Sequence, residues 1–158
     1  MIAHGTKEDV PEGKVLIEEG RTSNSIYLVL NGQFSVTVAA LGGAEVARMG
    51  AGEMVGEVSF VDSMAASGTV KAVTKSVVLA LPRALVFARL RKESAFAARF
   101  YRALAVLLAY RVRMSSVRKA GAAEEEADAR FQLDTGLLDN IHLAGARFER
   151  MTRKLMGG

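Results

Sequence analysis

The stretch of sequence that decides the fold runs from Gly50 to Phe60 and reads Gly-Ala-Gly-Glu-Met-Val-Gly-Glu-Val-Ser-Phe. Its three glycines let the backbone turn sharply and approach a ligand closely. Residues 56–60 predict the start of a short helix whose unpaired amides attract an anion. Glu57 would accept hydrogen bonds from a sugar hydroxyl but repel a phosphate. The pattern suits a ligand that contains ribose and phosphate, and a tight turn between strands explains the glycines equally well.

Around this stretch, residues 13–82 have the pattern of β structure. Residues 33–38 alternate polar and apolar with period two, as a half-buried strand does. Turn sequences such as Asn31-Gly32 separate the other β-rich runs. These runs are Val15–Ile17, Ile26–Leu30, Val46–Met49, Gly68–Val73 and Ser76–Leu81. Many short strands without a long helix between them predict a β sandwich or a small barrel.

After Pro82 the periodicity becomes helical. Apolar residues recur at spacings of three and four and share one helix face. They are Phe96, Phe100, Ala103, Leu107, Tyr110, Met114 and Val117. An acidic stretch, residues 124–126, separates this stripe from a second one that runs from Leu137 to Leu155. We interpret the first stripe as core or as a dimer contact.

The positive charge is concentrated in one segment. The chain has 21 Lys plus Arg and 17 Asp plus Glu, a net charge of +4. Residues 83–119 contain ten basic residues and one acidic residue, Glu93, so the remaining chain is acidic. Such a segment favours nucleic acid, acidic lipid or an anionic ligand as partner, and charge alone does not choose among them.

The composition argues against several classes of site. The chain has no cysteine, which excludes disulfides, a Cys-ligated zinc and a thiol nucleophile. Its two histidines, His4 and His142, lie at opposite ends of the sequence, and no pair of nucleophile and base is visible. We therefore expect no catalysis, no metal and no required cofactor.

No segment has the length of a membrane span. The longest apolar run, residues 103–110, has eight residues, whereas a spanning helix needs about 20. The N-terminal residues lack the basic and apolar regions of a signal peptide. We therefore expect a cytoplasmic location.

Several motifs, in order and in spacing, resemble the cyclic nucleotide-binding domain. They are Glu18-Glu19-Gly20, Ser25–Gly32, Gly50–Glu53 with Val55–Phe60, and Thr69–Ala72. The resemblance covers about residues 13–119. It implies an α+β fold with an eight-stranded β jelly roll, flanking helices and a phosphate-binding cassette. We expect this domain over residues 1–120, followed over residues 121–158 by an acidic linker and an amphipathic C-terminal helix.

The resemblance also implies which residues contact a ligand. By position, Gly56 and Val58 would supply backbone contacts, and Glu57 would hold the ribose 2′-hydroxyl. Ser67 would offer its hydroxyl and amide to the cyclic phosphate or the base. The helix around residues 104–114 would lie over the base and pair with its copy in a dimer. The candidate binding residues are Gly56, Glu57, Val58, Ser67, Gly68, Thr69 and Arg111.

Three of these residues also have a simpler interpretation. Glu57 can satisfy the first amides of its own helix, and Ser67 can merely begin a strand. Arg111 either supplies a charge to the pocket or lies in solvent on an exposed helix face, where arginines are common.

One departure from the family pattern concerns the phosphate. The family ordinarily has an arginine in the cassette that grips the cyclic phosphate, whereas this chain has Ala65 and Ala66 there. No Lys or Arg occurs from residue 56 to residue 70. A charge-assisted hydrogen bond contributes about 1.5–3 kcal/mol, so its loss weakens binding about ten- to a hundredfold.

Two functions remain open from the sequence. The first is a non-catalytic regulatory domain that senses a cyclic nucleotide of the cAMP or cGMP type, or a related ligand, with a weakened phosphate grip. The second is a ligand-free domain that acts as a dimeric scaffold or docks a protein partner. For both we expect a homodimer through helices 96–117 and 137–155. Sequence-specific DNA binding is not expected, because no helix-turn-helix follows the long helix.

Overall fold

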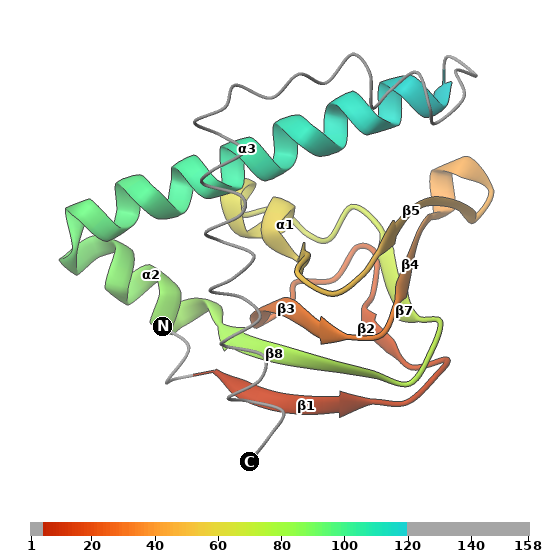
Figure 1. Ribbon diagram of the computed structural model, residues 1–158, viewed down its shortest axis with the longest axis horizontal. Coiled ribbons are helices and arrows are strands. Elements are labelled where there is room, and N and C mark those ends of the chain that lie inside the picture. Colours follow the sequence, from red (N-terminus) through yellow and green to blue (C-terminus); the bar gives the residue numbers. More distant parts are fainter. Residues whose placement is uncertain (1–4, 120–158) are drawn as a thin grey trace. The chain divides into compact units, whose positions relative to one another are not determined.

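The computed structural model describes residues 5–119 (Figure 1). They fall into two compact units, residues 5–89 and residues 90–119. The strands, all in the first unit, are β1 (Thr6–Val10), β2 (Val15–Ile17), β3 (Ser25–Asn31), β4 (Phe34–Val38), β5 (Ala44–Met49), β6 (Met54–Val55), β7 (Thr69–Ala72) and β8 (Ser76–Pro82). The helices are the 3-10 turn η2 (Ala39–Leu41), α1 (Glu57–Asp62), α2 (Arg83–Lys92) and α3 (Ser94–Lys119).

The strands form two four-stranded sheets. One has the order β1-β8-β3-β6 and the other β2-β7-β4-β5. All neighbouring strands are antiparallel, and β3 pairs with β8 from Ser25 opposite Pro82 to Asn31 opposite Val77. This arrangement confirms the expected eight-stranded jelly roll.

Six strands coincide with the β-rich runs of the sequence, and two do not. The run Thr6–Val10 contains Lys7, Glu8 and Asp9, and only Val10 of this strand is buried. It lies at the edge of its sheet beside β8, so its side chains need no apolar alternation. Strand β6 has only two residues, too few to show a period.

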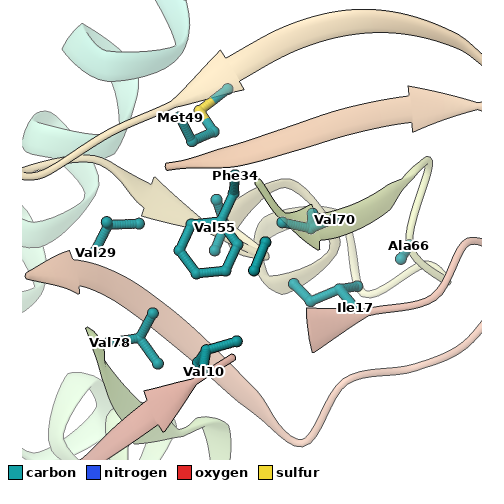
Figure 2. Packing of buried hydrophobic residues seen from close by; sticks show 10 residues of the cluster. Val10, Ile17, Val29, Phe34, Met49, Val55, Ala66, Val70 and Val78 are labelled. Carbon is teal, nitrogen blue, oxygen red and sulfur yellow. The ribbon is translucent and has the colours of Figure 1, made fainter. Parts of the chain in front are cut away.

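An apolar cluster in the described residues joins side chains of both sheets. It comprises Val10, Ile17, Val29, Phe34, Met49, Val55, Ala66, Val70, Ala72 and Val78. Figure 2 shows Ala66 at one end of this cluster, on the side of Ile17 and Val70. Burial of each large apolar side chain contributes about 1.5–3 kcal/mol. The cluster therefore stabilises the packing of the strands that contribute to it, and it includes Ala66 from the segment before β7.

The basic segment after Pro82 forms two helices, α2 and α3, which are separated at Glu93. On α3 the predicted apolar stripe is partly right. Phe100 is buried, but the next buried residue is Leu104, and Ala103 is exposed. No helix among residues 5–119 is long and apolar enough to cross a membrane. The predicted linker and the helix over 137–155 lie outside the described residues.

Candidate functional site

The predicted ligand loop begins at Gly56, which precedes α1. Gly56 has φ 84° and ψ 4°, in the left-handed region, where a side chain is strained. A Cβ at this position would also lie 3.1 Å from the Ile17 Cδ1 atom. Both constraints select glycine, and they set the direction in which α1 starts. The expected short helix is confirmed as Glu57–Asp62.

Glu57 is the first residue of α1 and is only 2% exposed. A carboxylate in the first turn is favoured by the helix amides. Two residues later the Ser59 hydroxyl donates to the Gly56 carbonyl at 3.2 Å, which closes the turn around Glu57. Val58, the other candidate on this helix, is 41% exposed, so only its backbone suits the predicted contact.

The far end of the loop is fixed by backbone hydrogen bonds. The Ala66 amide donates to the Arg21 carbonyl at 3.0 Å, and the Gly20 amide donates to the Ala66 carbonyl at 2.8 Å. Residues 20 and 21 belong to the connection between β2 and β3, and Ile17 at the end of β2 contacts the other end of the loop. We call residues 56–69 the cassette. Both ends of the cassette are therefore held by the same part of the chain.

The candidates Gly68 and Thr69 have structural partners of their own. A Cβ at Gly68 would lie 2.8 Å from the Thr37 carbonyl oxygen, so the close approach of β4 requires glycine there. The Thr69 hydroxyl accepts a hydrogen bond from the Glu19 amide at 3.1 Å. Ser67 is exposed. The structure thus brings Gly56 and Glu57 to one end of the cassette and Ser67, Gly68 and Thr69 to the other.

The cassette contains no basic residue. Ala66, at the position of the family arginine, is 8% exposed and is part of the apolar cluster. Arg21, whose carbonyl binds Ala66, has a side chain that is 76% exposed and pairs with Glu18 at 2.8 Å. The cassette therefore carries two carboxylates, Glu57 and Asp62, and no cation of its own.

Arg111, the remaining candidate, lies on α3 in the second unit. Its contact with a ligand stays a prediction. Among residues 5–119 no group of three His, Cys, Asp or Glu side chains lies where it would hold a metal ion.

Sequence reasoning missed Arg83, the first residue of α2. Its guanidinium donates to the Ser59 carbonyl at 2.5 Å, to the Ser59 hydroxyl at 3.4 Å and to the Ser23 carbonyl at 3.3 Å. It also lies 5.5 Å from the centre of the Phe60 ring. The Phe60 ring in turn stacks on Phe87 of α2 with centroids 4.3 Å apart. Arg83 and Phe87 thereby connect the cassette helix α1 directly to α2.

Comparisons with known proteins identify the family and the fold of this chain. The family model of the cyclic nucleotide-binding domain matches residues 7–93. The cyclic AMP receptor protein of Thermus thermophilus is 34% identical over 119 residues, which are 74% of this chain and 53% of that protein. The lysophospholipase nte1 of Neurospora crassa is 38% identical over 78 residues, 48% of this chain and 5% of that protein. The chain thus spans about half the length of the Thermus relative and a small part of the lysophospholipase.

Two solved structures are similar over most of the chain. The Thermus thermophilus catabolite activator protein has a TM-score of 0.61 and 30% identity, over 75% of this chain and 55% of its own. A cyclic nucleotide-binding domain from Methylobacillus flagellatus has a TM-score of 0.69 and 25% identity, over 73% of this chain and 66% of its own. In both comparisons about three quarters of this chain is matched.

Proposed function

The chain belongs to the cyclic nucleotide-binding domain family, and on this premise we propose that it is a non-catalytic regulatory domain that senses a ribose-bearing ligand. The ligand is of the cAMP or cGMP type or is related to it. The observation that carries the proposal is Glu57, a buried carboxylate in the first turn of α1, directly after the left-handed Gly56.

The chemistry at Glu57 supports the binding of a sugar. Glu57 is a carboxylate that is 2% exposed at the start of the cassette. The ribose 2′-hydroxyl, which a 3′,5′-cyclic phosphate leaves free, is a donor, and a hydrogen bond to an ionised group contributes about 1.5–3 kcal/mol. Ser67, at the other end of the cassette, adds an exposed hydroxyl. These groups would hold the sugar and the side of the ligand that faces the loop.

The phosphate grip is the weak part of the proposed site. Ala66 stands where the family has its arginine, and residues 56–70 hold no cation. We expect affinity for a cyclic nucleotide to be about ten- to a hundredfold lower than with the arginine present. Arg111 is the candidate for a substitute charge.

Calorimetric titration of the full chain with cAMP and cGMP tests the proposal. We expect binding that Glu57→Gln weakens about ten- to a hundredfold, because the amide cannot accept charge-assisted hydrogen bonds. Asp62→Asn is the matched control, since Asp62 is an exposed acid on the same helix, and its affinity should match that of the native chain. The absence of both heat and thermal shift at millimolar cAMP and cGMP would reject a cyclic nucleotide as the ligand.

A second function is favoured by the burial of Ala66 in the apolar cluster. If this packing closes the cassette to ligands, the domain serves as a dimeric scaffold or docks a protein partner. The homodimer through residues 96–117 and 137–155 belongs to this proposal, and to the sensor proposal as well. A chain that binds no ligand but self-associates would support the scaffold function and not the sensor function.

A further inference from the structure

We propose that the cassette binds a neutral nucleoside more tightly than the cyclic nucleotide that carries the same base. The inference rests on the proposed function, because it assumes that Glu57 holds a ribose. It concerns the class of ligand: a ribose with free hydroxyls and no phosphate.

The position of Ala66 is set by contacts of both its backbone and its side chain. Hydrogen bonds to Gly20 and Arg21 hold both its amide and its carbonyl. Its side chain belongs to the apolar cluster with Ile17 and Val70 (Figure 2). The position of the family arginine thus has its side chain packed in the apolar cluster and its amide already paired, so it offers a phosphate neither a cation nor this amide.

Two arginines contact the cassette, and both have other partners. The Arg21 carbonyl binds the Ala66 amide, but the Arg21 guanidinium pairs with Glu18 and is 76% exposed. The Arg83 guanidinium binds the carbonyls of Ser59 and Ser23. Either arginine would have to give up these partners before it could neutralise a phosphate.

The charge of the ligand distinguishes a cyclic nucleotide from a nucleoside at this site. A cyclic phosphate would add a negative charge to a cassette that already holds the carboxylates of Glu57 and Asp62, and like charges repel. Burying an unpaired ion costs far more than burying a hydroxyl that finds a partner. A nucleoside keeps the ribose hydroxyls and avoids both costs. Helix α1 has six residues, so its dipole is small and only partly offsets the phosphate charge.

The test compares ligands in pairs on the full chain. Calorimetry with adenosine against cAMP, and with guanosine against cGMP, should show the nucleoside of at least one pair binding about tenfold more tightly or better. Ala66→Arg should reverse this preference by supplying the missing cation. Leu41→Arg is the control, because Leu41 is 60% exposed on η2 and lies outside the cassette, and it should keep the nucleoside preference. A thermal unfolding curve of each variant shows whether it is folded.

The native chain alone also decides the question if Ala66→Arg does not fold. Tighter binding of cyclic nucleotides than of nucleosides would overturn the inference and leave the proposed function standing. If Arg111→Gln then abolished that binding, Arg111 would be the source of the charge. No binding of any of the four ligands would overturn the inference together with the sensor function.

Discussion

Arg83 is the side chain whose removal should disturb the first unit most directly. Its guanidinium joins Ser59 of α1 and Ser23 of the β2–β3 connection and lies over the Phe60 ring. Arg83→Met keeps much of the side-chain length but leaves both carbonyls without this donor. We expect the free energy of unfolding to fall by about 2–3 kcal/mol, because hydrogen bonds to a charged group are the strong ones.

Urea denaturation measures this effect, with Arg91→Met as the control. Arg91 is an exposed arginine on the same helix, and a surface substitution of this kind changes stability by about 0.5 kcal/mol or less. Equal stability of the two variants would show that the Arg83 contacts do not hold α1 and α2 together.

The sequence predicts site residues that stand in a short local pattern. It misses residues whose contacts come from distant parts of the chain. Gly56 and Glu57 are recognisable because a helix start after a glycine turn is a local pattern. Arg83 is not, since its partners lie 24 and 60 positions away. The burial of Ala66 is equally invisible, because alanine occurs inside and outside proteins.

The end of α1 offers a test at the scale of the element. Ser63 caps α1 with φ 59° and ψ 19°, the only non-glycine residue with positive φ in the described chain. Ser63→Gly removes a left-handed strain of about 1–2 kcal/mol and adds about 0.4–1 kcal/mol of unfolded-state entropy. We therefore expect it to stabilise the protein by up to about 1.6 kcal/mol.

Ala65→Gly is the matched change in the same loop. Residue 65 does not have a positive φ, so glycine there adds entropy without relieving strain, and we expect a loss of about 0.4–1 kcal/mol. Thermal unfolding of the two variants should show midpoints shifted in opposite directions. A parallel shift would mean that the end of α1 carries no strain.

The sequence predicts strands and helices correctly where the element is buried and its apolar pattern repeats. Strand β8 is predicted because it lies between β1 and β3 and is buried along almost its whole length. Strand β1 is missed because an edge strand can carry charges. On α3 the predicted stripe includes Ala103, but Leu104 is the buried residue. A period of 3.6 residues allows both positions, and an alanine does not reveal which side it faces.

For the whole molecule, the distribution of charge matters more than its sum. The chain has a net charge of +4, yet its ten-to-one excess of basic residues lies in residues 83–119 and none of it in the cassette. On α3, Arg99, Arg102 and Arg113 are all exposed. In the homodimer that the sequence predicts, the arginines of two copies would repel each other.

The predicted homodimer should depend on the exposed apolar side chains of α3 and on salt. Val106 and Tyr110 are 40% and 47% exposed and lie one turn apart on the helix. Sedimentation equilibrium should detect a dimer whose association strengthens with ionic strength, because salt screens the repulsion between arginines of two copies. Tyr110→Glu should weaken it at least about tenfold by burying a charge. Leu41→Glu, at a residue 60% exposed on η2, should leave it unchanged. A monomer at every salt concentration would exclude the dimer, and equal loss in both variants would place its interface elsewhere.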